Sequence, residues 1–291
     1  MTMLNDYFFW VVALGTMILG ATAAVVGTTV VLEKQSQLGD AIGHSVFPGI
    51  VFSFILFQTR HPLVLTAGAF VAGLVAFQLI HWIHRHSEFS YESILALILS
   101  SMFGLGMVLY SYIQGNPNFQ RAAQAGLNRY IMGQAAYLMI DDVILISVTS
   151  LCILFTFIVF FPKIKLVLFD KVFAKSIGIS TERVSKGLLL LCLLVICIGI
   201  KTVGIILISS MLVVPTVAAS QWTKHYRSLV ILSGFIGTVC ALIGTYFSTV
   251  VSDLATGPMI VIAQTLCALL SILFAPSGVL WQFLRRKDVS V

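Results

Sequence analysis

The stretch LGDAIGHSVFPG, residues 38–49, places an aspartate and a histidine between two apolar runs. On a helix, Asp40 and His44 stand at positions i and i+4, so they share one face. A carboxylate and an imidazole there are ligands that a divalent transition metal accepts. Alternatively, Asp40 caps the start of a helix and His44 is its interfacial partner. Pro48 and Gly49, one turn further on, indicate a bend or break that a simple cap does not need.

The composition of the chain places this stretch in a membrane protein. Of the 291 residues, 59% are hydrophobic and only 10% are charged, against roughly 25% charged residues in soluble domains. The mean hydropathy is +1.03. Apolar runs at 7–32 and 137–161 exceed the roughly 20 residues that cross a bilayer. We therefore predict an all-α, polytopic transmembrane helical bundle that forms one domain over residues 1–291.

Breaks in the apolar pattern predict eight or nine membrane spans. They are expected at about 7–32, 39–57, 62–83, 91–113, 137–162, 185–200, 203–221, 229–250 and 257–281. The count depends on residues 187–221, where Lys201 interrupts a long apolar run. This run forms either two short spans, or one span and a broken helix beside a cavity.

The distribution of positive charge predicts the orientation of the chain. With nine spans and the N-terminus outside, one side of the membrane holds 13 Lys and Arg residues and the other holds 4, which together make the 17 in the chain. Because cytoplasmic loops carry the excess of Lys and Arg, we predict an external N-terminus and a cytoplasmic C-terminus. The same placement explains the net charge of +6 without a nucleic-acid partner.

Two segments between spans are long enough to bind a partner. Residues 114–136 are predicted to form an external loop that opens with a Gly-Asn-Pro-Asn turn signal. Residues 162–186 hold six positive charges in an amphipathic pattern, in which Phe173 is apolar while Lys171 and Lys175 are charged. We predict that this second segment is cytoplasmic and docks a partner or lies on the surface of the lipid bilayer.

Other acidic residues are weaker candidates for a metal site. A charged residue inside the bilayer costs about 2.5–3.5 kcal/mol on insertion scales, so each is a functional hypothesis. Asp253 lies in the connection SDLATGP, where a surface acid is the alternative. Glu92 follows Ser90 at the start of a span, where a helix-start acid is the alternative. The sequence contains no G-x-x-x-x-G-K-[ST] P-loop, so we expect no enzymatic activity, no resident cofactor, and an energy source elsewhere.

The opening stretch resembles the signature of the ABC-3 family, the manganese, zinc and iron permeases of ABC importers, whose pattern is approximately G-D-A-x-x-H-x-x-x-P-G. The matching residues are Gly39, Asp40, Ala41, His44, Pro48 and Gly49. The resemblance continues in family order at residues 92–109, 124–136, 168–180, 203–219 and 252–276. It implies a type II ABC importer permease in a bacterial plasma membrane, which works by alternating access as a dimer, with an ATPase beneath it and an external metal-binding receptor.

The resemblance also implies roles for particular residues. Asp40 and His44 are similar to the family's metal-coordinating gate. Residues 168–180 resemble the segment that couples the permease to its ATPase. The coupling residues carried over are Leu168, Phe169, Asp170, Lys171, Phe173, Ala174, Lys175 and Gly178. Residues 124–136 look like the manganese-type branch, in which two related permeases can pair, so we expect transport of Mn²⁺, with Zn²⁺ or Fe²⁺ as alternatives.

Three questions stay open at this point. The expected start of the second span places Asp40 near the cytoplasmic end, whereas a gate against backflow is expected further out. A secondary transporter, in which Asp40 binds a coupling ion, is a rival, although such a carrier would not need residues 162–186 as a docking surface. An intramembrane metalloenzyme would need a third strong ligand and a general base near Asp40 and His44, and the sequence offers none nearby.

Overall fold

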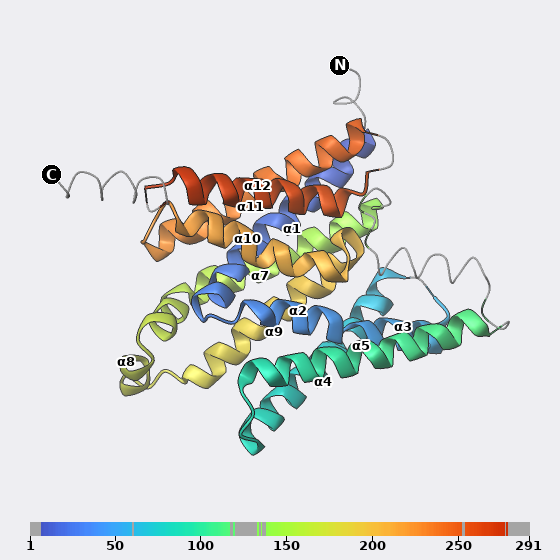
Figure 1. The fold of residues 1–291 in the computed structure, drawn as a ribbon, viewed down its shortest axis with the longest axis horizontal. Helices are drawn as coiled ribbons and strands as arrows, with labels where there is room; N and C mark the ends of the chain where they lie inside the picture. Colours follow the sequence, from blue (N-terminus) through green and yellow to red (C-terminus); the bar gives the residue numbers. More distant parts are fainter. Residues whose placement is uncertain are drawn as a thin grey trace.

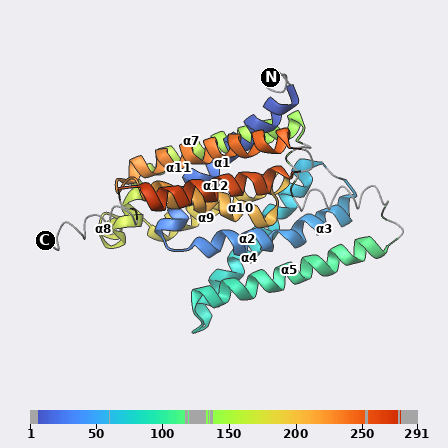
Figure 2. The ribbon, with the colours of Figure 1, turned by 45° about the horizontal axis from the view of Figure 1, so that its top comes forward.

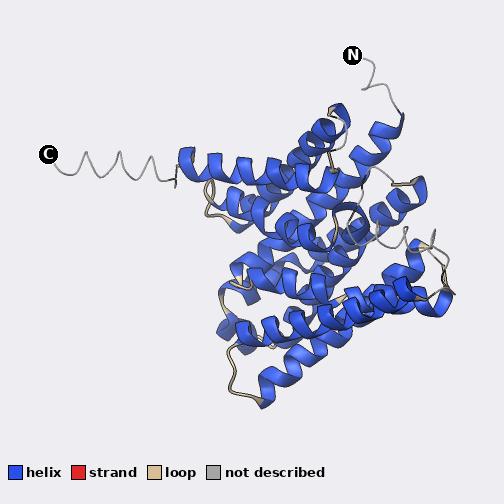
Figure 3. Cartoon of the chain, turned by 45° about the vertical axis from the view of Figure 1, so that its right-hand side comes forward, coloured by secondary structure: helices blue, strands red, loops and turns tan. Residues whose placement is uncertain are grey.

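The computed structural model describes residues 7–59, 61–116, 119, 133, 135, 138–251, 254–276 and 278. This part of the chain contains helices and no strand, as Figure 3 shows with the helices in blue. The helices are α1 (Tyr7–Leu32), α2 (Ser36–Ser45), α3 (Phe47–Phe57), α4 (Pro62–His86), α5 (Tyr91–Gly115), α7 (Ile140–Phe169), α8 (Lys171–Ser176), α9 (Thr181–Val203), α10 (Ile205–Ser220), α11 (Tyr226–Val250) and α12 (Thr256–Phe274). The predicted all-α fold is confirmed. Asp253 and most of the predicted loop at 114–136 lie outside the described residues.

The described helices confirm the predicted number of spans. Eight segments are long and apolar enough to cross a membrane, with α2 and α3 counted together as Ser36–Phe57. The ninth, α10, has 16 residues, a length of about 24 Å. The run at 187–221 therefore forms two helices, α9, which is long enough to span a membrane, and the shorter α10. They are separated by Gly204, whose φ of +93° is a backbone conformation that glycine adopts most easily.

Helix α1 lies inside the bundle, in contact with α7, α9, α10 and α11 (Figures 1 and 2). A Cβ atom added at Gly27 would overlap the backbone of Leu212 on α10. The hydroxyl groups of Thr216 and Ser233 both donate to the carbonyl oxygen of Ala24. Lipid tails are as apolar as leucine, so close approach at small residues and hydrogen bonds of this kind hold membrane helices together.

The perimeter of the bundle is apolar and exposed. Only 22% of the most apolar window of α7 is buried, against 67% in α9. On α7, the side chains of Leu151, Phe155 and Ile158 are all exposed. Apolar side chains at such positions are suited to face lipid or a second chain. Helix α7 therefore lies at the edge of the bundle, and α9 lies within it.

The lysine that interrupts the long apolar run forms an ion pair. Lys201 near the end of α9 donates to Oδ2 of Asp142 in the first turn of α7. The amide of Met139 donates to the same oxygen, at 2.9 Å. The Asp142 side chain is only 3% exposed, and a buried carboxylate is costly unless it is paired. The pair therefore ties the start of α7 to the end of α9.

Helix α7 continues past Pro162, which corrects the predicted end of the fifth span. Proline removes one backbone donor, but a membrane helix tolerates it because neighbouring groups satisfy the freed carbonyl. The predicted segment at 162–186 is accordingly mostly helical: its first part extends α7 to Phe169, and its last part belongs to α9. Only α8 and its short connections stand between them, at one end of the bundle (Figure 1). We refer to this end as the α8 end.

Candidate metal site and coupling helix

Helix α2 presents Asp40 and His44 side by side. The Nε2 atom of His44 lies 3.6 Å from Oδ1 of Asp40, and the side chains are 15% and 47% exposed respectively. Leu38 and Ile42 on the opposite face are buried, so the apolar side of α2 packs inward and turns the polar pair outward. The helix begins at Ser36. The alternative that Asp40 caps the N-terminus is therefore wrong, because Asp40 lies a full turn inside the helix.

The spacing of the two side chains suits a divalent cation. A tetrahedral ion with bonds of about 2.1 Å holds two of its ligand atoms about 3.4 Å apart, close to the 3.6 Å between Nε2 and Oδ1. The imidazole ring lies edge-on against Phe103, with 5.1 Å between ring centroids. Its Nδ1 atom is buried and has no hydrogen-bond partner among the described residues. Packing therefore holds the ring with Nε2 toward Asp40.

The position of Phe103 shows how deep the pair lies. Phe103 is the middle residue of the 25-residue helix α5. His44 therefore lies level with the centre of α5, and Asp40 lies one turn, about 6 Å, nearer to the start of α2. The pair is deeper in the bundle than the predicted boundary at residue 39 indicated, because α2 begins earlier, at Ser36.

A break in the second span follows the pair directly, as Pro48 and Gly49 predicted. Val46 separates α2 from α3, and Pro48 lies in the first turn of α3, where its missing N–H costs least. A Cβ atom added at Gly49 would overlap the backbone of Gly68 and the side chain of Ala72 on α4. The glycine thus lets α3 pack closely on α4 immediately after Asp40 and His44.

Among the residues that the structure describes, Asp40 and His44 would form only part of a coordination shell. No group of three His, Cys, Asp or Glu side chains within metal-binding distance occurs among the residues that the structure describes. Glu92 lies in the first turn of α5, about 16 Å along the helix from Phe103, so the structure does not bring it to His44. Asp253 lies outside the described residues. The arrangement is an open, two-ligand site.

Helix α8 is a short, well-capped helix at the tip of the bundle (Figure 2). Oδ1 of Asp170 accepts a hydrogen bond of 2.8 Å from the amide of Phe173 and so caps its N-terminus. Ala174 is fully buried and anchors the helix, while Gly178, with φ of +82°, ends the turn that follows. Apolar side chains nevertheless face outward, namely those of Phe169, Val172, Phe173 and Ile177. Such an apolar patch is typical of a docking surface.

Helix α8 also contacts the connection between α1 and α2, the helix that carries Asp40 and His44. Nζ of Lys171 lies 3.6 Å from Oε1 of Glu33, whose side chain is only 12% exposed. Glu33 lies between α1 and α2, seven residues before Asp40. We did not predict a role for Glu33 from the sequence. The only hint in the sequence was that Glu33 belongs to the polar turn EKQSQ, residues 33–37. That α8 lies beside this turn is evident only from the fold.

The whole chain is similar to known metal-transport membrane proteins. The profile of the ABC 3 transport family matches residues 5–275. The zinc transport system membrane protein TroC of Treponema pallidum is 37% identical over 292 residues, which span 100% of this chain and 97% of TroC. The manganese transport system membrane protein MntC of Bacillus subtilis is 38% identical over 267 residues, which span 92% of this chain and 60% of MntC.

Solved structures agree in fold. PsaBC from Streptococcus pneumoniae, solved in complex with Fab, contains a chain that superposes with a TM-score of 0.84 at 26% identity, covering 98% of this chain and 97% of that one. A metal-chelate type ABC transporter in an inward-facing conformation superposes with a TM-score of 0.67 at 15% identity, covering 89% and 84%. The second match supports the fold alone.

Proposed function

The chain belongs to the ABC 3 transport family, and from this premise we propose that it is the membrane permease of an ATP-driven metal importer in which Asp40 and His44 bind the metal in transit. Its relatives are named as membrane proteins of zinc and manganese transport systems. Membership of an ABC family excludes the rival reading as an ion-coupled secondary transporter. The chain is a transport subunit rather than an enzyme.

The observation that supports a metal gate is the pairing of His44 and Asp40 at mid-depth on an outward face of α2. Nε2 and Oδ1 stand 3.6 Å apart and both side chains are accessible in part. Conduction requires a site that binds an ion well enough to accept it and weakly enough to release it. Two protein ligands leave most coordination positions open, which favours transient binding over storage.

A second permease chain completes the site in this proposal. In a two-fold symmetric dimer the same surface of both chains meets at the axis. Two copies of the pair would then provide two imidazole nitrogens and two carboxylates around one ion. The second chain is either another copy of this one or a related permease that carries the same motif.

The α8 end is the cytoplasmic end, and an ATPase on a separate chain docks there. The segment around α8 carries much of the positive charge that marks the cytoplasmic side, and α8 offers the apolar patch described above. Movement of α8 would reach α2 through the contact between Lys171 and Glu33. A metal-binding receptor delivers the ion at the opposite end. In this proposal the chain lies in a bacterial plasma membrane with its N-terminus outside.

The transported ion is Mn²⁺ in this proposal, with Zn²⁺ and Fe²⁺ as the alternatives. A carboxylate and an imidazole accept all three ions. The affinity order places Mn²⁺ below Fe²⁺ and Zn²⁺, so a sparse site would release Mn²⁺ most readily. Competition between isotopically labelled Mn²⁺ and unlabelled Zn²⁺ during uptake would identify the preferred ion.

Metal uptake in cells that lack their own importers tests the function. The permease is expressed with its ATPase and receptor, and we expect Asp40→Ala and His44→Ala each to reduce Mn²⁺ uptake at least tenfold. Matched controls are His61→Ala and Asp141→Ala, which remove the same side chains at exposed positions and should retain uptake. Normal uptake by both gate variants would place the metal path elsewhere, and uptake without any ATPase would exclude an ATP-driven importer.

A further inference from the structure

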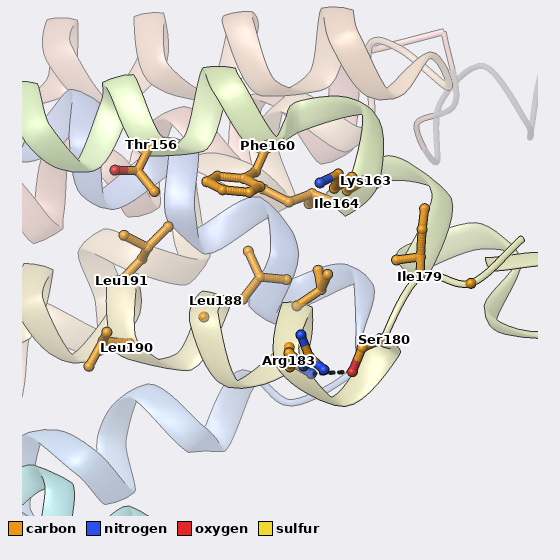
Figure 4. A pocket seen from close by; sticks show the side chains of 13 residues that line it. Thr156, Phe160, Lys163, Ile164, Ile179, Ser180, Arg183, Leu188, Leu190 and Leu191 are labelled. Carbon is orange, nitrogen blue, oxygen red and sulfur yellow. Dashed lines mark hydrogen bonds between the residues drawn. The ribbon is translucent and has the colours of Figure 1, made fainter. Parts of the chain in front are cut away.

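A cavity between α7 and α9, close to α8, has no part in the proposed metal path. Its volume is about 520 Å³, within the range of roughly 300–1,000 Å³ that is usual for ligand pockets. Figure 4 shows its two walls: Thr156, Phe160 and Lys163 project from α7, while Arg183, Leu188 and Leu191 project from α9. The cavity therefore joins a cationic end to an apolar end.

The cationic end carries two charges that no acidic residue in the described part of the chain neutralises. Lys163 and Arg183 come from opposite walls, and neither forms an ion pair with any described residue. Nζ of Lys163 lies 5.4 Å from the centroid of the Phe160 ring. The nearest acid in sequence, Glu182, is already engaged by Arg85 at 2.7 Å and by Lys186 at 2.8 Å. An anion between Lys163 and Arg183 would find two free partners.

The apolar end extends away from these charges along α7 and α9 (Figure 4). Leu188 and Leu191 are buried, whereas Phe160 at the rim is 45% exposed. The exposed apolar stripe of α7, described above, lies on the same helix. A ligand that enters from the bilayer would therefore place its charge at Lys163 and Arg183 and its apolar part along the leucines.

We propose that this cavity binds an anionic phospholipid such as phosphatidylglycerol, with the phosphate between Lys163 and Arg183 and an acyl chain in the apolar end. Basic pockets between membrane helices on the cytoplasmic side are suited to such headgroups. A free phosphate would use only the cationic end and leave the apolar end unfilled. The site is independent of the Asp40 and His44 gate, and it relies only on the cytoplasmic placement of the α8 end.

Because of the position of the cavity, a bound lipid would affect the coupling between the permease and its ATPase. Gly178, Ile179 and Ser180, which connect α8 to α9, also line the cavity. The hydroxyl of Ser180 accepts a hydrogen bond from the amide of Arg183, so the headgroup site and the α8 connection share the same turn. A bound phospholipid would brace the segment against which the ATPase pushes.

Native mass spectrometry of the full chain in detergent tests the proposal. Phosphatidylglycerol is titrated in parallel with phosphatidylcholine of the same acyl chains and with glycerol 3-phosphate. The double variant Lys163→Gln/Arg183→Gln should bind phosphatidylglycerol roughly 30-fold more weakly, since each basic residue contributes about one factor of five for anionic lipid. The control Lys224→Gln/Arg227→Gln removes one Lys and one Arg at exposed positions of the same end and should bind normally.

A second variant tests the apolar end without changing charge. A Cβ atom added at Gly187, which lines the cavity, meets no other atom within 4 Å, so Gly187→Leu should fold and fill the space. We expect it to weaken phosphatidylglycerol binding at least tenfold. Gly104→Leu, at a glycine on α5 that is equally open, is the control and should bind normally.

Four results would overturn the assignment. Equal binding of phosphatidylcholine, or equal loss in both charge variants, would exclude recognition of the headgroup charge. Displacement by glycerol 3-phosphate at the same concentration would leave only a small-anion site. Lipid binding by monomers but not by dimers would show that a second chain covers the cavity.

Discussion

At the scale of single residues, the few charges that lie within the bundle are partnered by specific groups. Asp40 pairs with His44 and Lys201 with Asp142. The first pair could be predicted because it is local and follows the period of one helix. The second could not, because its members lie 59 residues apart and only the packing of α7 on α9 brings them together.

The ion pair between Lys201 and Asp142 is expected to stabilise the fold. Lys201→Met would leave Asp142 as a buried, uncompensated carboxylate, which costs about 3–5 kcal/mol. We expect a clearly lower thermal unfolding midpoint for the purified chain in detergent. The double variant Asp142→Asn/Lys201→Met should recover most of the loss, because the amide still accepts from the N–H of Met139. A neutral effect of Lys201→Met would show that Asp142 does not depend on the lysine.

At the scale of helices, whether a helix breaks or continues at a proline depends on the residues that surround the proline. Pro48 stands at the break between α2 and α3, whereas Pro162 and Pro215 lie inside α7 and α10. The break before Pro48 could be predicted because Gly49 follows it, and a glycine permits close contact with α4. The continuation through Pro162 could not, because whether a freed carbonyl is satisfied depends on tertiary neighbours that a local pattern does not contain.

Close packing of α3 on α4 predicts a sensitive position at Gly49. Gly49→Ala would force a methyl group into the backbone of Gly68, and overpacking of this kind costs typically about 1–3 kcal/mol. Gly104→Ala on α5, where a Cβ meets no atom within 4 Å, should be neutral or stabilising by about 0.5–1 kcal/mol. Thermal unfolding of both variants in detergent provides the comparison, and equal midpoints would contradict the packing described for α3.

The contact between α8 and the α1–α2 connection predicts a charge-swap result. Glu33→Lys or Lys171→Glu alone would place like charges together, and we expect metal transported per ATP hydrolysed to fall roughly fivefold, the effect of about 1 kcal/mol for a partly exposed pair. The double swap should restore most of the coupling. Lys224→Glu, at an exposed site of the same end, is the control. A double variant as impaired as the single ones would show that the contact does not transmit movement.

At the scale of the whole molecule, hydropathy locates the spans along the sequence but does not show which spans lie in the interior of the bundle and which lie at its edge. Helix α7 has the most apolar window of the eight spans yet is among the least buried, whereas α9 is less apolar and the most buried. In a bilayer, apolar side chains face lipid, and interior helices pack through small and polar residues such as Gly27 and Thr216. The positions of the spans were therefore predictable from the sequence, while their arrangement required the fold.

The asymmetry of positive charge predicts the orientation of the assembled protein. Fusion of green fluorescent protein to the C-terminus should fluoresce, because this reporter folds in the cytoplasm. Fusion of alkaline phosphatase to the N-terminus, behind a cleavable export signal, should be active because the enzyme needs an external compartment. The opposite pattern of reporter activity would show that the bundle has the reverse orientation, with α8 away from any cytoplasmic ATPase.

The most direct test of the account asks whether Mn²⁺ binds to His44. Electron spin echo envelope modulation of the purified transporter, with Mn²⁺ raised until the site fills, detects coupling to a directly bound imidazole nitrogen. We expect a nitrogen signal in the wild-type protein and in His61→Ala, and its loss in His44→Ala. An unchanged nitrogen signal in His44→Ala would contradict the assignment of Asp40 and His44 as the metal gate.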